Sequence, residues 1–587
     1  MFFYLNASLF SDTPVTVQEV SRNHQDFNLK NRLYLQRGQQ YCHRKVLQKG
    51  ELILLGDPVF PVETLDWDRF ISRENEPNQD ELFLVVRGHY HFFYITDEAL
   101  FCGSSLSAIY PIYYSKNGEQ LLVSSSAFAL AEQLPNPSQD KSNLLERLLF
   151  NYTFFNTTWW EGIDLLDTHR YLRIGRGGYQ LAGTFEISNY FGSPGSSSRN
   201  SLKDLMPVFQ QEIELFFPDQ PFGISFTGGF DGRTLVAAAR KAEKQFSTYS
   251  FGRPSSSDIR FPLRQSPALG IPYNPIYLDE KYLNESALAN AQEFVAASEY
   301  NGNFGRPHYT YAAKQLSKDV KFILTGNFGS ELFRALHEPG VMISQATVDV
   351  FHSVGEEWKD KLKTATKRWD GAFFSDALDQ LIARMEEYLA PRKDWDANHR
   401  FYHFVFNDLF RKYFGPELIM QSQYFNNRTP YLSLSWIQTL NQTIWSGVHA
   451  RLFEKKLNKR MKGQMFYSSF LKYADRQMYH QTTNKAYSSA DVLERWRLPL
   501  LVGKVVIHKY IKEREDNENA SQDFFGKYHK QIADHWDLNQ LPDCLQRELN
   551  RSLQEIPDGK SLDLWIKIYS IMQGWNAAQL QAPIMNK

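Results

Sequence analysis

The sequence predicts an α/β protein with two domains, a β-rich amino-terminal part followed by a doubly wound parallel sheet. The length of 587 residues exceeds what one hydrophobic core usually supports. From residue 222 to residue 279, strands and helices alternate in the order typical of a parallel sheet. Glycine, proline and serine replace apolar periodicity in FGSPGSSSRNS at residues 191–201. We therefore predict domains at residues 1–190 and 202–587, with a linker at 191–201.

Residues 1–190 contain runs rich in aromatic and β-branched residues, such as ELFLVVRGHYHFFYITD and PIYYSKNGEQLLVSSSAFAL. In the second run, Asn117 and Gly118 are a hairpin signal between apolar alternations. His89 and His91 alternate on one face of a predicted strand, but the sequence places no third ligand beside them. This part is therefore predicted to consist mainly of strands, without a metal site at the histidines.

A glycine turn, TGGFDGR at residues 227–233, lies between the apolar strand 222–226 and an alanine-rich helix. Gly228 and Gly229 let bare backbone approach an anion, and the helix start adds N–H donors and the positive end of its dipole. Asp231 lies inside the turn, and the Mg²⁺ that accompanies a nucleotide usually binds one or two carboxylates. The turn predicts a pyrophosphate and magnesium site, although a plain glycine turn of an α/β protein would have the same pattern.

This turn resembles the SGGxDS pyrophosphate loop of the asparagine-synthetase type of ATP pyrophosphatases, with Thr227 for the first serine and Gly232 for the last. Three further stretches resemble that family in the order it requires: FSTYSFGRPSSSD at 246–258, KFILTGNFGSELFRA at 321–335 and QSQYFNNRTPYLSLSW at 421–436. In the second, a strand is expected to break at Gly326 into a turn and then a helix, and the third resembles a helix and loop of the family. The second stretch keeps Gly326 and Glu331, but Ser330 stands where the family has a metal-binding aspartate. The resemblance implies an ATP site built from several turns.

Three cations have matching or neighbouring positions in the family. Arg428 matches the arginine of ExRxPFLD, with Asn426 and Ser433 in place of two acids. TTNKAYSS places Lys485 where the family has a lysine over the adenylate, and a cation there stabilises charge that develops in transition states. Arg334 replaces a glycine and adds a cation near the phosphates. The catalytic residues implied are Lys485, Glu331 and Arg428, and the metal ligands implied are Asp231 and Glu331.

The nucleotide contacts implied by the resemblance lie at the ends of the predicted parallel strands. They are Ser225, Thr227, Gly228, Gly229, Asp231, Gly232, Arg233, Ser250, Phe251, Gly252, Gly326 and Asn327. Asp258 resembles the acid that follows the family's second nucleotide-contacting strand. A plain helix cap or first-turn acid explains Asp258 equally well.

The amino-terminal part resembles the glutamine amidotransferase domain of asparagine synthetases, including the stretch TTWWEGIDLLDTHRYL. The resemblance implies an αββα sandwich of Ntn-hydrolase type, followed by a Rossmann-like doubly wound sheet of adenine nucleotide α hydrolase type with carboxyl-terminal helices. The family's nucleophile is a cysteine directly after the initiator methionine, where this chain has Phe2. Cys42 and Cys102 lie elsewhere in this half. We expect a retained structural domain that does not hydrolyse glutamine.

Charge and cysteine content exclude several classes of function. The chain has 65 basic and 66 acidic residues, whereas nucleic-acid binding normally needs a basic excess. Three cysteines without a CxxC pair argue against a disulfide framework or a zinc knuckle and favour a reducing cytoplasm. MFFYLNASLF lacks the features of a signal peptide, and LPLLVGKVVI is too short to span a bilayer. We expect neither nucleic acid nor a membrane as a partner.

The resulting prediction is a ligase that uses ATP and Mg²⁺ to activate a carboxylate as an acyl-adenylate, after which an amine forms an amide. Asparagine synthetases, β-lactam synthetases and lasso-peptide cyclases, which the chain resembles, share this adenylation. The carboxylate is that of an aspartate, a peptide or a sugar acid, and the amine is ammonia, ammonia from a partner glutaminase, or a substrate amine. The alternative is a non-catalytic binding or scaffold protein. A base-thiolating enzyme of RNA is disfavoured by the neutral charge and the absence of cysteine pairs.

Overall fold

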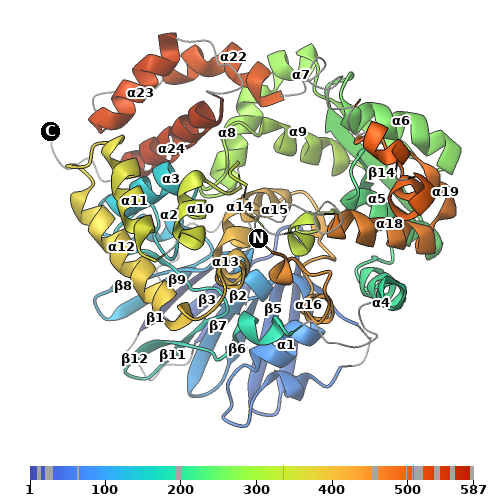
Figure 1. The fold of residues 1–587 in the computed structure, drawn as a ribbon. Coiled ribbons are helices and arrows are strands. Elements are labelled where there is room, and N and C mark those ends of the chain that lie inside the picture. Colours follow the sequence, from blue (N-terminus) through green and yellow to red (C-terminus); the bar gives the residue numbers. More distant parts are fainter. Residues whose placement is uncertain are drawn as a thin grey trace.

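Two six-stranded sheets lie face to face in the amino-terminal part of the computed structural model (Figure 1). The structure describes the chain except residues 9–14, 20–30, 62–64, 194–200, 335, 337, 341, 354, 452–460, 498, 505–506, 508–519, 535–541, 555–561 and 582–587. The strands of the two sheets are β1 (Phe2–Ser8), β2 (Thr16–Glu19), β3 (Arg32–Gln36), β4 (Tyr41–Leu47), β5 (Gly50–Val59), β6 (Arg87–Ile95), β7 (Ala99–Ser104), β8 (Tyr113–Asn117), β9 (Gln120–Ser124), β10 (Asp164–Leu165), β11 (Tyr171–Gly175) and β12 (Gly178–Ala182).

The first sheet has the order β10-β8-β9-β1-β3-β2 and the second the order β12-β11-β7-β6-β5-β4. Alternate side chains of each strand fill the space between them, and the rings of Phe3 in β1 and Phe93 in β6 lie 5.0 Å apart. The opposite face of the first sheet packs on α2 (Ala127–Ala131) through Tyr4 and Leu130. The second sheet presents Leu52 and Leu54 to a core shared with α1 (Gln79–Val85). The predicted αββα layering is confirmed.

The hairpin predicted at Asn117 and Gly118 is also present. β8 and β9 pair antiparallel, with Asn117 opposite Gln120. Gly118 has φ of +60°, in the left-handed region that glycine adopts without strain.

The third sheet is entirely parallel and has the order β15-β14-β13-β16-β17. Its strands are β13 (Phe222–Ser225), β14 (Phe246–Gly252), β15 (Tyr273–Tyr277), β16 (Phe322–Leu324) and β17 (Asn426–Arg428). In chain order this is the 3-2-1-4-5 arrangement of a doubly wound fold, whose topological switch point lies between β13 and β16. The predicted parallel sheet is therefore confirmed, and its switch point identifies the edge at which ligands of such folds bind.

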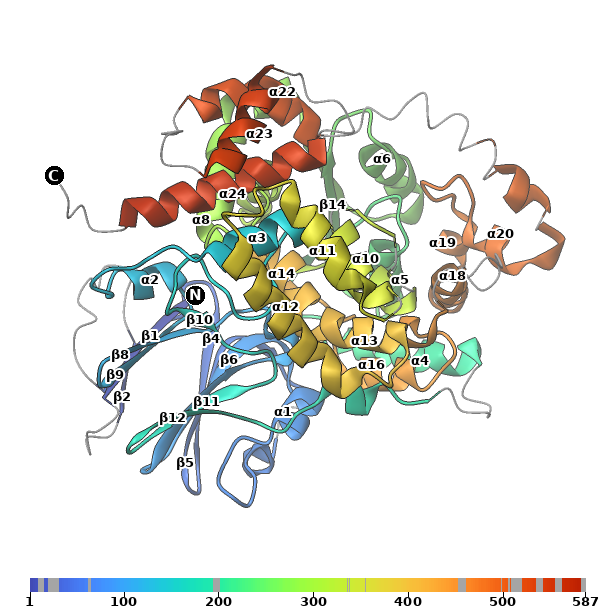
Figure 2. The same ribbon diagram turned by 60° about the vertical axis from the view of Figure 1, so that its left-hand side comes forward.

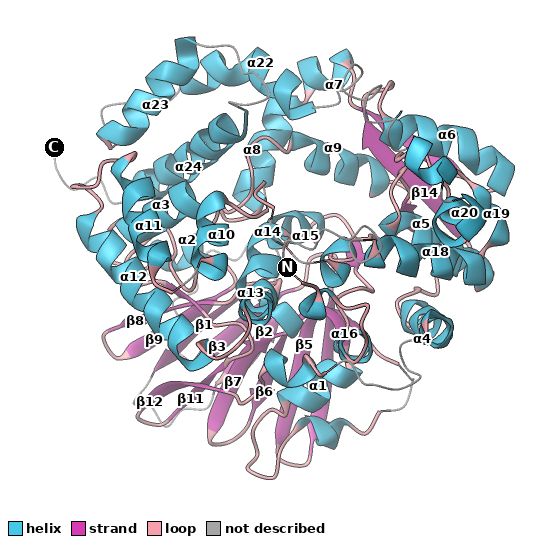
Figure 3. Ribbon diagram, in the orientation of Figure 1, coloured by secondary structure: helices cyan, strands magenta, loops and turns pink. Residues whose placement is uncertain are grey.

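Helices surround this sheet and join it to the amino-terminal sandwich (Figure 3). They are α3 (Lys141–Phe150), α4 (Leu202–Glu214), α5 (Asp231–Lys241), α6 (Ser257–Leu269), α7 (Glu280–Glu285), α8 (Ala287–Ala297), α9 (Pro307–Leu316), α10 (Gln345–His352), α11 (Glu357–Lys367), α12 (Ser375–Leu389), α13 (Ala397–Phe404), α14 (Phe410–Tyr413), α15 (Gly415–Gln421), α16 (Leu434–Asn441), α18 (Lys462–Ala474), α19 (Arg476–His480), α20 (Ser489–Leu493), α22 (Ala520–Ala533), α23 (Asp543–Gln554) and α24 (Leu562–Gln581).

Two local expectations differ from the structure. The helix expected after the turn at residue 326 is only a short 3₁₀ turn, η5 (Ser330–Phe333). The stretch expected to form a helix and loop around Arg428 instead supplies β17, which pairs with β16. Both segments are short, and tertiary pairing decides their conformation.

The carboxyl-terminal helices return to the amino-terminal half. Figure 2 shows α22, α23 and α24 above the sandwich, and α24 contacts both α3 and α8. The Lys567 ammonium of α24 donates to the Leu148 carbonyl of α3 at 2.9 Å. In the described residues, no helix is long and apolar enough to cross a membrane. The proposed domain boundaries stay a prediction, because residues 194–200 of the predicted linker lie outside the described part of the chain.

Candidate active site

Two glycine turns meet at the switch point of the parallel sheet. The turn at 227–233 follows β13 and starts α5, and the turn at 325–331 follows β16, the neighbouring strand. Their backbones approach so closely that a Cβ on Gly326 would lie 2.5 Å from the Asp231 Cβ. The sequence separates these turns by almost a hundred residues, and the parallel pairing of β13 with β16 brings them together.

Close packing leaves no room for a Cβ atom at several glycines of this site. A Cβ on Gly228 would lie 2.5 Å from the Asn484 Cβ, and one on Gly329 would lie 2.7 Å from Asp231 Oδ1. At Gly232 a Cβ would lie 2.0 Å from the Ser225 carbonyl oxygen. The serine that the resembled family has at position 232 therefore does not fit this backbone. The departure from SGGxDS is consistent with the local geometry.

Asp231 is the central acid of the site. Its Oδ2 accepts a hydrogen bond from Ser330 Oγ at 3.3 Å. Its Oδ1 is buried and has no partner of good hydrogen-bond geometry among the described residues, although the Tyr467 hydroxyl lies close by. Burial raises the pKa of Asp231, while Tyr467, Ser330, Arg334 and Lys485 act in the opposite direction. A buried carboxylate oxygen left without a protein donor is suited to a cation.

Glu331 is the second acid, and it is only 8% exposed. Burial raises the pKa of Glu331 to about 7; Arg334 lowers it, and the charge of Asp231 raises it further. The Arg334 guanidinium donates to Glu331 Oε1 at 3.3 Å. Two carboxylates that repel each other in a buried site are a suitable pair for one divalent cation.

Asp231 and Glu331 are the two acids that this site offers to a metal ion. The described residues contain no group of three or more histidine, cysteine, aspartate or glutamate side chains arranged to hold a metal. Mg²⁺ bound with a nucleotide needs no such group, because phosphates and water complete its octahedron. Ser330 donates to Asp231 and does not supply a third acid. The residues present therefore fit a magnesium ion that arrives with ATP.

Lys485 lies on a loop that docks on the first glycine turn. The Asn484 amide donates to the Gly228 carbonyl at 3.0 Å, and Thr482 pairs with Ser488 across the loop. Lys485 itself is exposed, and its charge lowers the pKa of Asp231. The backbone contact thus holds a cation beside the buried acid.

Arg233 is placed differently from the prediction of a nucleotide contact. It is fully buried, and its guanidinium donates to the carbonyls of Gly229 at 3.4 Å and Thr482 at 3.5 Å. Burial lowers the pKa of Arg233 to about 10. In this structure it links the glycine turn to the Lys485 loop, so its effect on a nucleotide would be indirect.

Of the three nucleotide contacts predicted at the end of β14, Ser250 and Gly252 make contacts within the protein, and Phe251 lines a cavity. Ser250 Oγ donates to the Asp258 carbonyl at 2.6 Å and is hydrogen-bonded to the Tyr273 hydroxyl at 2.7 Å. The Ser250 hydroxyl therefore already has protein partners. Asp258 lies in the first turn of α6, whose N-cap is Ser256. A Cβ on Gly252 would lie 2.5 Å from Ser256 Oγ, so this glycine serves close packing.

A cavity of about 120 Å³ lies at the carboxyl ends of β13, β14 and β16. The predicted residues Ser225, Phe251 and Asn327 line it, as the switch-point rule leads one to expect. The lining residues that sequence reasoning missed include Tyr309 of α9 and Glu417 of α15. Glu417 is buried, and burial raises its pKa. Its only sequence signal is an acid inside an apolar helix, which does not by itself indicate a site.

The Arg428 carbonyl accepts from the Thr325 amide at the start of the second glycine turn at 3.2 Å, while its side chain pairs with the amino-terminal half. Its guanidinium forms a bidentate pair with Asp57 of β5, at 2.8 and 3.0 Å, and donates to the Phe216 carbonyl at 3.1 Å. Ser433, which replaces an acid of the family motif, donates to Glu212 at 2.6 Å. The acid that orients Arg428 therefore comes from the amino-terminal sandwich. These contacts give Arg428 a role in joining the two halves, and its catalytic role stays a prediction.

A parallel sheet with glycine turns and buried acids at its switch point defines an α/β domain of nucleotide-binding type. Residues 214–442 match the family model of asparagine synthase. This match, over 229 of the 587 residues, agrees with the resemblance that the motifs indicated. The match supports an ATP-dependent, amide-forming ligase that acts on a carboxylate and an amine.

A solved structure gives only a weak match to this chain. The chain is similar to the glutamine phosphoribosylpyrophosphate amidotransferase from B. subtilis complexed with ADP and GMP, with 11% identity over 56% of this chain and 71% of that chain. The TM-score is 0.16, so this likeness carries no argument about fold or function. No curated protein matched the chain.

Proposed function

We propose that the protein is an AMP-forming ligase that joins a carboxylate to an amine. The observation that supports this most directly is a pair of acids on adjoining glycine turns at the switch point, with Lys485 docked beside them. Glu331 is buried, and Asp231 is half-buried with its Oδ1 fully covered. Burying such charges without a ligand is costly, so a site that keeps them is suited to a bound cation and polyphosphate.

In this proposal ATP lies across the two turns, with the backbone N–H of Gly228 toward its phosphates. The Gly229 N–H donates to Thr227 Oγ1 at 3.2 Å and would have to exchange this partner for a phosphate oxygen. Asp231 and Glu331 would hold Mg²⁺, which would neutralise charge on the phosphates when bound. An oxygen of the substrate carboxylate attacks the α-phosphorus, the bond to the bridging oxygen breaks, and pyrophosphate leaves. The amine then attacks the acyl carbon and AMP departs. Lys485 stabilises the negative charge that develops in both steps.

The amino-terminal sandwich is proposed to be a structural domain without its own glutaminase activity. Burial raises the pKa of the Cys42 thiol to about 11, and burial likewise raises the pKa of Cys102. Neither thiol is thus suited to act as a nucleophile near neutral pH. The amine is then free ammonia, ammonia from a partner glutaminase, or a substrate amine. The unpaired cysteines support a reducing compartment such as the cytoplasm.

The test is pyrophosphate release from ATP and Mg²⁺ with a panel of carboxylates, with and without ammonia. Release that depends on one carboxylate and is lost in Asp231→Ala and Lys485→Ala is expected. Lys318→Ala, an exposed lysine outside the site, is the matched control and should retain activity. With a carboxylate labelled by heavy oxygen, the label should appear in AMP; label in inorganic phosphate would contradict adenylation.

The second candidate is a non-catalytic binding protein. It is favoured by Ser330, which donates to Asp231 where the resembled family has a further acid. This alternative predicts ATP binding by calorimetry without pyrophosphate release for any carboxylate. A failure to bind ATP would remove both candidates.

A further inference from the structure

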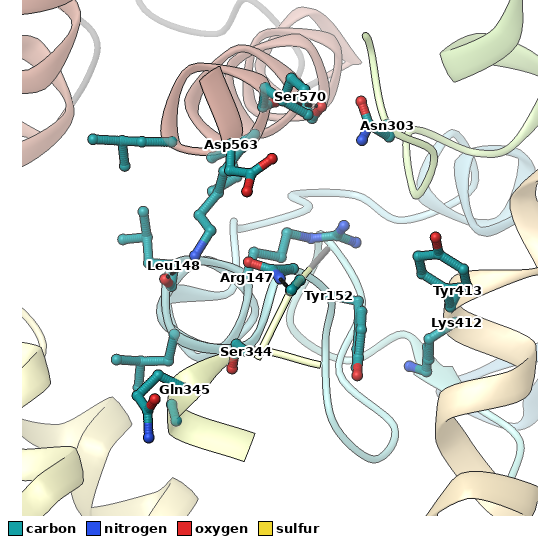
Figure 4. Close-up of a pocket in the computed structure, with 18 of the residues that line it drawn as sticks. Arg147, Leu148, Tyr152, Asn303, Ser344, Gln345, Lys412, Tyr413, Asp563 and Ser570 are labelled. Carbon is teal, nitrogen blue, oxygen red and sulfur yellow. Dashed lines mark hydrogen bonds between the residues drawn. The ribbon is translucent and has the colours of Figure 1, made fainter. Parts of the chain in front are cut away.

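A cavity of about 740 Å³ lies between α3, α10, α11, α14 and α24. Figure 4 shows Arg147 at its centre, with Lys412 and Tyr413 on one side and Asp563 and Ser570 of α24 on the other. Its volume is within the range of about 300 to 1,000 Å³ that small-molecule sites occupy. The cavity is thus large enough for a ligand bigger than a free amino acid.

The lining of this cavity is rich in cations. Its basic residues are Arg147, Arg306, Lys361, Arg368, Lys412 and Lys567, and its acidic residues are Asp349, Glu417 and Asp563. Lys361 lies 3.5 Å from Asp349, and Arg368 lies 3.9 Å from Glu548. Among the described residues, no carboxylate lies within ion-pair distance of the other four, of which Arg147, Lys412 and Lys567 carry the argument below.

Arg147 is almost fully buried, with 5% of its surface exposed. Its guanidinium donates to the neutral amide oxygens of Asn143 at 2.8 Å and Asn301 at 2.5 Å, and stacks on Trp159 with its centre 4.1 Å from the ring. Burial lowers the pKa of Arg147 to about 10. Its surroundings hold the side chain in place without neutralising it.

The two lysines have the same kind of surroundings. Lys412 donates to Thr153 Oγ1 at 2.7 Å and to the Phe155 carbonyl at 3.0 Å, and Lys567 donates to the Leu148 carbonyl. Burial lowers their pKa values to about 7 and about 8. An ammonium has three donors, so each lysine keeps at least one for a ligand. Asp408 and Glu146 raise the pKa of Lys412, and Asp563 raises that of Lys567, without an ion pair among the described residues. An anion in the cavity would supply a closer counter-charge.

The cavity adjoins the proposed active site. Glu417 lines both this cavity and the smaller one at the carboxyl ends of the strands. Glu417 therefore lies between the large cavity and the smaller one at the strand ends.

We propose that this cavity binds the body of the carboxylate substrate, and that the substrate is an anionic molecule, larger than a free amino acid, with at least two negative charges. That the bound anion is the substrate rests on the proposed ligase function. The charge preference of the cavity does not depend on it. Arg147, Lys412 and Lys567 contact the anionic groups, while the reacting carboxylate extends toward Glu417 and the glycine turns.

The binding test uses the full-length protein without ATP, so that it does not depend on catalysis. Calorimetry should show binding of triglutamate and much weaker binding of triglutamine, its uncharged match. Lys567→Gln keeps a donor for the Leu148 carbonyl but removes the charge, and should weaken triglutamate binding about ten-fold, the value of one hydrogen bond to a charged group. Lys318→Gln is the control, and ATP binding should be unchanged in both variants.

A second measurement needs no variant. Reductive methylation of the wild-type protein, mapped by mass spectrometry, should show that triglutamate protects Lys412 and Lys567 whereas triglutamine does not. Equal binding of the two peptides, or unchanged modification of both lysines, would overturn the inference. If triglutamate binds but no carboxylate supports pyrophosphate release, the anion site stands and only the proposed ligase function fails.

Discussion

Replacing Gly232 should disrupt the first glycine turn, even when the new residue is the serine of the resembled family. A Cβ at this position would lie 2.0 Å from the Ser225 carbonyl oxygen, whereas real Cβ contacts under 3.0 Å essentially do not occur. The end of β13 and the start of α5 must therefore separate by about 1 Å, and such overpacking costs about 2 kcal/mol.

The change is measured by thermal unfolding of Gly232→Ala and Gly232→Ser without ligand. We expect the melting temperature to fall by about 2 to 3 °C, because a domain as long as residues 202–587 unfolds with an entropy of about 0.8 kcal/mol/K. The matched control is Gly229→Ala in the same turn, where the nearest atom to the new Cβ is the Thr227 Oγ1 at 3.3 Å, the end of a side chain. Wild-type stability of Gly232→Ser, or faster pyrophosphate release by it, would refute the reasoning.

Three further predictions concern the charged residues. Lys485→Ala should lower the turnover number by about 10² to 10³ with little change in stability, because Lys485 is exposed and acts on developing charge. Since burial raises the pKa of Glu331 to about 7, its ionised form accumulates as the pH rises, so Mg·ATP affinity should increase between about pH 6 and about pH 8 and Glu331→Gln should abolish this dependence. The same shift makes the ligand-free fold less stable as the pH rises from 4.5 to about 7. Arg428→Ala should destabilise the fold by about 3 kcal/mol or more, because it leaves Asp57 buried without its partner.

Each of these has its own control. Lys318→Ala should behave as wild type where Lys485→Ala does not, and a loss of activity in both would point to a general effect. A Glu331→Gln protein that keeps the pH dependence would assign the titration to another group. For the ion pair, Asp57→Asn combined with Arg428→Ala should cost less than the two single changes added together, whereas additive effects would contradict direct coupling.

The sequence alone determined four of the five strands of the parallel sheet and the positions of the turns that follow β13 and β16. Apolar runs with turn residues predicted β13, β14, β15 and β16, because strand and helix periodicity and glycine turns are local properties. The motif order further identified Asp231, Glu331 and Lys485, which the structure brings near one another. Local signals were sufficient there, since each residue lies within a few positions of a strand end.

Tertiary structure decided what depends on partners far away in the chain. Arg428 pairs with Asp57, 371 residues earlier, and Ser330 donates to Asp231 across the switch point. The large cavity forms only because α24 returns to cover α3. Such contacts arise from the packing of whole elements, whereas a sequence pattern records only the preferences of neighbouring residues. The fold of each segment is therefore readable locally, but the partner of each charge is set by which surfaces the folded chain brings together.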